Sequence, residues 1–266
     1  MFYDILFGHG VWVGILSIPA CFALFSYMGI RVFKLIPVHI RQSHRDTVSY
    51  GLATISIFTA VLLASIAVTA WELHAKAEAS VSQEAQLAAD VLRGSFAMPE
   101  PLKSELMKGG QNYLDIVINE EWPQMGNSNH NFQKGWDALV DLYMTTTKFR
   151  TNDSVVQIQY ADLYQKVSTL IDARRNRVLS SKDHLPPIVW ATLIAAAIIN
   201  IIFLFLFSME NQAMHDFIAI LISIVIGFVI AFILAFDSSY EGPMAIPADA
   251  YESVRINFIK YKAMYP

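Results

Sequence analysis

Four long stretches of the chain contain no charged residue. They are Val11–Ile30, Val48–Ala70, Ile188–Met209 and Phe217–Phe236. Because a helix needs about 20 apolar residues to cross the hydrocarbon core of a bilayer, each stretch predicts one transmembrane helix. The stretches form two pairs, and short loops at residues 31–47 and 210–216 join the members of each pair. The pattern therefore predicts one transmembrane hairpin within residues 1–71 and a second within residues 186–237.

The region between the hairpins, residues 72–185, is mostly helical in its pattern. Its first apolar positions follow one another at steps of three and four, at Leu73, Ala77, Val81, Ala85, Ala88 and Leu92. This spacing predicts that the second span continues as a helix beyond the membrane until Gly94 or Pro99. The predicted fold is therefore an all-α membrane protein, in which two hairpins flank a helical extramembrane region. We expect the C-terminal tail, residues 238–266, to lie against that region.

Three further helices are expected in the extramembrane region. The first begins at Pro99, since proline suits the first helical turn, and the second surrounds Trp136. The third begins near Asn152-Asp153-Ser154, which are favourable N-cap residues. Pro186-Pro187 separates this last helix from the third span.

Composition supports a membrane location. The chain is 55% hydrophobic and only 16% charged, which is typical of a protein embedded in a lipid bilayer. Its formal net charge of −4 gives no reason to expect nucleic acid as a partner. Four aromatic residues stand at span ends on one predicted side and resemble an interfacial belt, namely Trp12, Trp71, Trp190 and Tyr240.

The orientation in the membrane stays open at this point. The pairing places both termini on the same side as residues 72–185 and places both hairpin loops on the other side. Loop 31–47 is basic, which favours the cytoplasm, but a second basic cluster surrounds Arg175 before the third span. The positive-inside rule therefore does not decide between the two orientations.

No catalytic motif is present in the sequence. We find no glycine-rich phosphate loop, no metal-ligand spacing of Cys and His, and no nucleophile elbow. The sequence therefore predicts no enzyme, no cofactor and no metal site. His215 stands near Glu210 and Asp216 in the short second loop, where a solvated turn is a better interpretation than a metal or proton site.

An ordered set of short motifs runs through nearly the whole chain. The set consists of His44-Arg45-Asp46, Ala60–Ala64, Trp71-Glu72, Gln83-Glu84-Ala85, Glu121-Trp122-Pro123, Arg174-Arg175-x-Arg177, Leu185-Pro186-Pro187-x-x-Trp190, and Asp237 with Gly242. In this order the chain resembles the bacterial bestrophin-like domain family, which comprises four-span membrane proteins of unassigned function. Two departures are Arg45 and Ser239-Tyr240, where that family usually has Asn and Pro-Phe.

The resemblance implies a function, an oligomeric state and a subcellular location. Bestrophins are pentameric anion channels, so the likeness implies a homo-oligomer, five subunits, inorganic ions as ligands and a bacterial inner membrane. It also implies that the second span lines the pore and narrows it with apolar side chains. By resemblance, Phe58 and Leu62 take that role.

The helical wheel of the second span supports this implication. At about 100° per residue, one face of the helix carries polar side chains with Phe58 among them. The pore-lining candidates are Thr54, Phe58, Leu62, Ser65, Thr69 and Glu72. A water-filled pathway with an apolar constriction shows this order of polar, apolar and polar residues. The alternative is packing, since Ser and Thr in membrane helices commonly bond to their own backbone or to a neighbouring helix.

Charged residues near the span ends also have two interpretations. Asp237 and Glu241 are candidates for a pore mouth, and Arg174, Arg175 and Arg177 are candidates for anion contact. Alternatively, the arginines pair with internal acids such as Glu120 and Glu121, an interpretation that we favour. Two functions follow: a homo-oligomeric ion channel, or a non-conducting scaffold or sensor that acts through its extramembrane helices.

Overall fold

The computed structural model describes residues 11–35, 45–126, 132–207 and 211–264. These residues form helices joined by short turns, without a strand among them. The all-α prediction is therefore confirmed. The chain divides into two compact units, and each unit is described by itself.

The first unit comprises Met1–His74, His184–Ser238 and Gly242–Met244. Its helices are α2 (Val11–Phe33), the first part of α4 (Arg45–Ser95), α8 (Pro187–Leu206) and α9 (Gln212–Asp237). By length and composition, α2, α4, α8 and α9 are the four described helices that could cross a membrane. They coincide with the four predicted apolar stretches. The structure also confirms that α4 continues to Ser95 without interruption.

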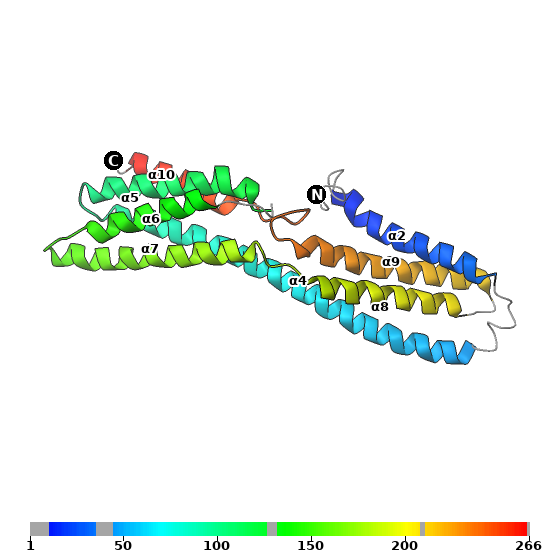
Figure 1. The fold of residues 1–266 in the computed structure, drawn as a ribbon. Helices are drawn as coiled ribbons and strands as arrows, with labels where there is room; N and C mark the ends of the chain where they lie inside the picture. Colours follow the sequence, from blue (N-terminus) through cyan, green and yellow to red (C-terminus); the bar gives the residue numbers. More distant parts are fainter. Residues whose placement is uncertain (1–10, 36–44, 127–131, 208–210, 265–266) are drawn as a thin grey trace. The chain divides into compact units, whose positions relative to one another are not determined.

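Helices α2 and α9 lie side by side in close contact (Figure 1). A Cβ atom at Gly227 would lie 2.6 Å from the Cα of Pro19, so α9 has no room for a side chain at this position. Between membrane helices, close packing rather than the hydrophobic effect stabilises association, and small residues permit it. Gly227 therefore sets the distance between the two helices.

Helix α9 begins earlier than predicted. The side chain of Asn211 accepts hydrogen bonds from the backbone N–H groups of Ala213 and Met214, so it caps the helix. His215 is consequently not in a solvated turn. It is buried, and its Nε2 atom donates to the carbonyl of Leu204 at 3.0 Å. Glu210 lies outside the described residues.

The second unit comprises Ala75–Asp183, Ser239–Glu241 and Ala245–Pro266. Its helices are the remainder of α4, α5 (Leu102–Ile116), α6 (Gln133–Lys148), α7 (Ser154–Ser180) and α10 (Asp249–Met264). A short π-helix, η1 (Val117–Glu121), and a 3-10 turn, η2 (Trp122–Gln124), follow α5. The predicted cap of α7 is confirmed, since Asp153 accepts from the N–H groups of Val155 and Val156.

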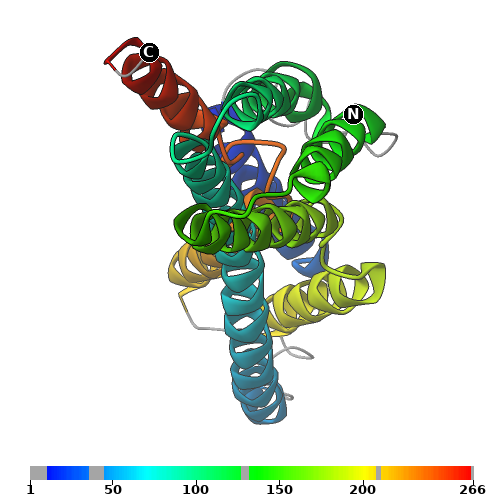
Figure 2. The ribbon, with the colours of Figure 1, turned by 90° about the vertical axis from the view of Figure 1, so that its left-hand side faces the viewer.

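Most of the C-terminal tail, namely Ser239–Glu241 and Ala245–Pro266, belongs to this second unit, whereas Ser238 and Gly242–Met244 belong to the first. Tyr251 and Phe258 of α10 are buried in its apolar core, and α10 lies beside α5 in both views (Figures 1 and 2). Tyr240 departs from the predicted aromatic belt. Its ring packs edge-on against Trp122, with ring centroids 5.9 Å apart, and its hydroxyl lies 3.1 Å from that of Ser180. Tyr240 therefore belongs to the core of the second unit.

Candidate functional site

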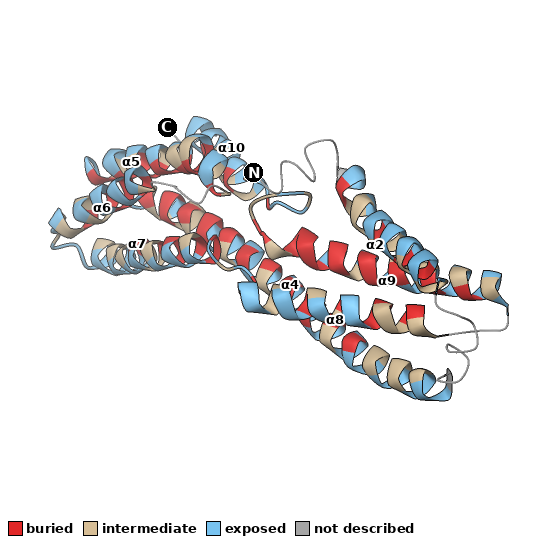
Figure 3. Cartoon of the chain, turned by 45° about the vertical axis from the view of Figure 1, so that its right-hand side comes forward, coloured by how far each residue is buried: buried red, intermediate tan, exposed pale blue. Residues whose placement is uncertain are grey.

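Within the first unit, helix α4 has one buried side. Buried and exposed residues alternate in helical register (Figure 3), and the buried positions of this part of α4 include Thr59, Leu63, Ile66 and Ala70. At about 100° per residue, these positions lie on the side of the helix opposite Thr54. Helix α4 therefore packs against the described residues of the first unit with a single buried stripe.

The pore-lining candidates lie on the opposite, open side of α4. Thr54, Ser65, Thr69 and Glu72 are exposed, and the Phe58 side chain is 72% exposed. Leu62 is half-buried at the edge of the set. Because α4 is one uninterrupted helix, these six residues share one face, which we call the α4 face.

Two polar side chains of the α4 face bond to their own helix. The hydroxyl of Thr54 donates to the carbonyl of Tyr50 at 2.9 Å, and that of Thr69 donates to the carbonyl of Ser65 at 3.0 Å. Each hydroxyl oxygen keeps lone pairs that can accept a further bond. Asn200 of α8 donates to Ser56 of α4 at 3.2 Å, which is a hydrogen bond between two helices.

Glu72 and Lys76 do not form the ion pair that their i,i+4 spacing favours, although both are exposed. No described basic side chain lies within ion-pair distance of the Glu72 carboxylate. Among the described residues, the α4 face therefore carries an unpaired acid at one end.

The second unit holds a buried cluster of four charged side chains, Glu84, Glu121, Arg174 and Arg177. Arg174 binds Glu121 through two bonds of 2.6 Å, and it also donates to the carbonyl of Phe132 at 2.8 Å. Arg177 donates to Glu84 at 2.7 and 3.2 Å and to Glu121 at 2.8 Å. Two acids and two bases balance one another, so the cluster is neutral overall.

Neutral and aromatic side chains complete this charged cluster. The hydroxyl of Tyr113 donates to Glu84, and Arg177 also donates to the sulfur of Met125 at 3.1 Å. The Arg177 guanidinium lies 5.7 Å from the ring centroid of Trp122. Gly135 of α6 packs directly on the pair, because a Cβ there would collide with the Glu121 carboxylate.

Burial and charge act in opposite directions on the Glu121 carboxyl group. Burial alone would raise the pKa of Glu121, but the hydrogen bond from Arg174 and the charge of Arg177 outweigh it, so its pKa lies below the ordinary value. Burial beside Glu84 raises the pKa of the Tyr113 hydroxyl well above its ordinary value. The pKa of Arg177 is also raised, since the charge of Glu84 overcomes the cost of burial. Glu121 and Arg177 are therefore charged, and Tyr113 is neutral, near pH 7.

Of the three arginines predicted to contact anions, the structure brings two into this cluster. Arg174 and Arg177 are occupied by internal acids, as in the alternative that we favour from the sequence. Of the two acids named there, Glu121 takes part, whereas Glu120 pairs with Lys134 at 2.6 Å on the surface. Arg175 is exposed and lies 3.9 Å from Asp172. Sequence reasoning missed Glu84, although the Gln83-Glu84-Ala85 motif contains it.

Asp237 joins two of the sequence motifs. Its side chain accepts from the backbone N–H of Leu185 at 2.7 Å and from the indole N–H of Trp190 at 3.3 Å. Its carbonyl also lies 2.9 Å from Nδ1 of His184. The carboxylate thus holds the start of α8 against the end of α9. Glu241, the other mouth candidate, is half-buried, and its side chain lies against Gly126 of the second unit.

Among the described residues, no group of three His, Cys, Asp or Glu side chains has the arrangement of a metal site. In the second unit, the charged side chains of Glu84, Glu121, Arg174 and Arg177 bond to one another instead. The α4 face presents hydroxyl groups, an aromatic ring and one carboxylate.

The model of the Bestrophin-like domain family matches residues 20–251. The chain belongs to the bestrophin-like family. The matched stretch includes the whole α4 face, the charged cluster and the Asp237 contacts. No curated protein matches the sequence of this bestrophin-like chain.

Solved structures share the bestrophin-like fold. One is described as a membrane protein with a single proline-to-alanine change; its TM-score is 0.66 at 11% identity, covering 92% of this chain and 97% of that one. Another is a bacterial bestrophin homolog from Klebsiella pneumoniae with a single leucine-to-threonine change; its TM-score is 0.63 at 10% identity, covering 93% and 98%. At these identities the likeness concerns the fold. The bestrophin-like chain is thus an integral membrane protein with a channel-like fold.

Proposed function

We propose that this bestrophin-like chain forms a homo-oligomeric ion channel whose pathway is lined by the α4 face. The observation that carries the proposal is the exposure of that face on the side opposite the buried stripe. The face places hydroxyl groups on both sides of Phe58 and Leu62, and a carboxylate at one end. This order suits a hydrated pathway with an apolar constriction.

An oligomer is required because one chain cannot enclose such a pathway. Four apolar helices per subunit leave the α4 face, with its hydroxyl groups, on the outside of the single chain. Several copies around an axis would turn the face toward water. By the family resemblance we propose five copies, in a bacterial inner membrane, with both termini on the side of residues 72–185.

The structure bears on the permeant ion. Arg174, Arg177 and Asp237 have internal partners, whereas Glu72 of the α4 face is exposed and the exposed Lys76 follows it one helical turn later. Kinship with bestrophins favours an anion, whereas a ring of Glu72 carboxylates favours cations. The reversal potential in a KCl gradient distinguishes these ions. Glu72→Gln should move that potential toward anion selectivity if the ring faces the pathway.

Electrical recording in planar bilayers tests the proposal. The purified oligomer should conduct, and Phe58→Ala and Leu62→Ala should each raise its conductance by widening the constriction. The matched control is Val225→Ala, which shortens an exposed side chain of α9 and should leave conductance unchanged. A verified oligomer that conducts no more than an empty membrane would overturn the channel and favour the scaffold. Equal effects of all three changes would overturn the role of the α4 face.

A further inference from the structure

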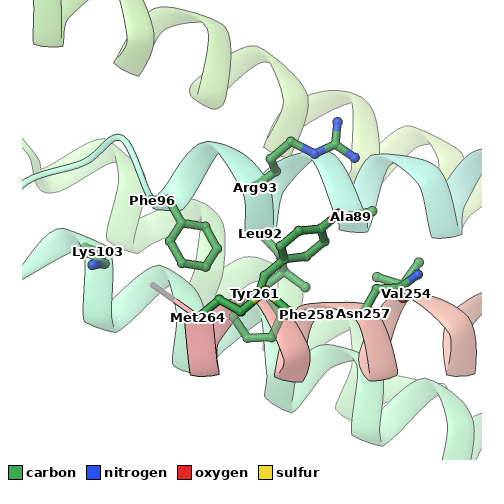
Figure 4. A pocket seen from close by; sticks show the side chains of 10 residues that line it. All are labelled: Ala89, Leu92, Arg93, Phe96, Lys103, Val254, Asn257, Phe258, Tyr261 and Met264. Carbon is green, nitrogen blue, oxygen red and sulfur yellow. The ribbon is translucent and has the colours of Figure 1, made fainter. Parts of the chain in front are cut away.

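A groove of about 800 Å³ lies within the second unit, at the meeting point of α4, α5 and α10 (Figure 4). Its walls are mainly apolar and aromatic and include Leu92, Phe96, Val254, Phe258, Tyr261 and Met264. The volume falls in the range of about 300–1,000 Å³ that is typical of small-molecule sites. The groove is thus large enough for a ligand with a long apolar chain.

The walls of the groove differ in how far the chain itself covers them. Leu92 and Phe258 are buried and form the floor, with Phe258 packed on Phe96 at 6.1 Å between ring centroids. Tyr261 and Met264, in contrast, are exposed on the last turns of α10. An aliphatic chain in the groove would remove these exposed apolar side chains from water.

The charges of the groove have one sign. Arg93 and Lys103 are both lining residues, and the lining contains no acid among the described residues. Arg93 points outward in Figure 4 and pairs with Asp90 at 3.0 Å, so its charge is already balanced. Lys103 makes no ion pair with any described carboxylate.

Lys103 stands beside the apolar wall. Its Nζ atom lies 5.7 Å from the ring centroid of Phe96, and the side chain is half-buried. An ammonium group at the edge of an apolar groove, with no described acid as its partner, favours an anionic group attached to an apolar chain. The charge complementarity and the shape thus indicate the same class of ligand.

We propose that this groove binds a long-chain aliphatic carboxylate, with the carboxylate on Lys103 and the chain along Phe96, Phe258 and Met264. The carboxylate carries one negative charge, which matches the single positive charge of the Lys103 ammonium group. The proposal concerns the second unit and does not depend on conduction, so it can fail or succeed separately from the proposed channel.

Photo-crosslinking tests the site in the full-length protein. The protein, reconstituted in nanodiscs of neutral lipid, is irradiated with palmitate that carries a diazirine on its chain, and the labelled peptides are mapped by mass spectrometry. Labelling should concentrate on residues 89–103 and 254–264, and excess unlabelled palmitate should suppress it. Labelling confined to the apolar helices α2, α8 and α9 would overturn the proposal.

Binding measurements test the role of the charge. Lys103→Met keeps an aliphatic stem without the ammonium and should weaken palmitate binding at least about tenfold, as expected for a charge-assisted hydrogen bond. Lys103→Arg should retain most of the affinity. Lys108→Met, on an exposed turn of α5, is the matched control and should bind like the wild type. Equal weakening by Lys103→Met and Lys108→Met would contradict a specific contact.

Two further ligands and one variant distinguish the contribution of the carboxylate to binding from that of the aliphatic chain. Methyl palmitate, which lacks the charge, and butyrate, which lacks the chain, should both bind more than about tenfold more weakly than palmitate. Ala89→Phe fills the groove and should abolish saturable binding without changing Lys103. Binding of methyl palmitate as tight as that of palmitate, or unchanged binding to Ala89→Phe, would overturn the assignment.

Discussion

The two units of this chain are stabilised from the inside in different ways. The core of the first unit is built from apolar side chains and from the close approach of α2 and α9 at Gly227. The core of the second unit contains, besides its apolar residues, the buried charges of Glu84, Glu121, Arg174 and Arg177. Each core thus depends on a different kind of contact.

We propose that the surroundings account for this difference, with the first unit in the bilayer and the second in water. Within a bilayer, lipid chains are as apolar as leucine, so helices associate through close packing at small residues. In water, apolar burial already stabilises the helical region, and a buried ion cluster adds little net stability over an apolar core of the same volume. Removing only one member of the ion cluster, however, leaves an uncompensated buried charge. The second unit should therefore tolerate concerted changes better than single ones.

The largest effect is expected from Arg177→Met. The change leaves Glu84 buried without its cation, and breaking such a pair costs about 3–5 kcal/mol. We expect hydrogen exchange to show a fall of this size in the opening free energy of the second unit, with little change in the first. Arg175→Met removes an exposed arginine of the same helix and should cost less than about 0.5 kcal/mol.

The double variant Glu84→Met with Arg177→Met tests whether the buried charges act together in the second unit. It leaves Arg174 and Glu121 as a balanced pair, so the double variant should be more stable than Arg177→Met alone. A double variant as unstable as the sum of its single changes would show that the charges do not act together.

Gly227→Val should act on the first unit. The added side chain meets the backbone of Pro19, which cannot move aside as a flexible side chain could. We expect a loss of about 1–3 kcal/mol, measured as faster exchange in α2 and α9, while the second unit keeps its protection. Val225→Leu enlarges an exposed position of the same helix and should be close to neutral.

A smaller effect is expected at Asp237. Asp237→Ala leaves the N–H of Leu185 and the indole of Trp190 without their acceptor, which should cost about 1–2 kcal/mol. Asp237→Asn keeps one acceptor oxygen and should cost less than Asp237→Ala. Exchange of the Leu185 amide reports the loss directly, and identical exchange in both variants would argue against the hydrogen bond as the cause.

The mildest change is acidification, which removes no atom. The pKa of Glu121 is lowered in the folded protein, so its ionised form stabilises the fold. This contribution is complete above the ordinary value of 4.5 and is lost as the pH falls through the lower folded value. The midpoint temperature of thermal unfolding should therefore decrease as the pH is lowered below about 4.5, which circular dichroism can measure. Glu121→Gln, which cannot ionise, should show a flatter acid profile.

Local features of the fold could be predicted from the sequence because they depend on neighbouring residues. The apolar stretches locate the spans, and Asp153 caps α7 where its position predicts a helix start. The α4 face follows from helical periodicity alone. Helix α9 begins five residues before the predicted apolar span because Asn211 caps it, and a hydropathy pattern does not detect caps.

The charged cluster could be predicted only in part. A pairing of the arginines with Glu121 was one of two interpretations, but Glu84 is 93 residues from Arg177 in the sequence. No periodicity connects positions so far apart on different helices. The same holds for Asp237, whose partner Leu185 is 52 residues away. A pore-mouth acid and a carboxylate that binds a neighbouring helix look alike until the packing is known.

The neutrality of the charged cluster also constrains how this sequence can change over evolutionary time. Replacing any one of its four charged residues leaves a buried, unbalanced charge, which destabilises the fold. Single substitutions in the cluster should therefore be selected against. Gly135 adds a further restriction, because any larger residue there meets Glu121. Relatives that lack Arg177 should therefore also lack Glu84, and those with a side chain at position 135 should carry a shorter or neutral residue at position 121.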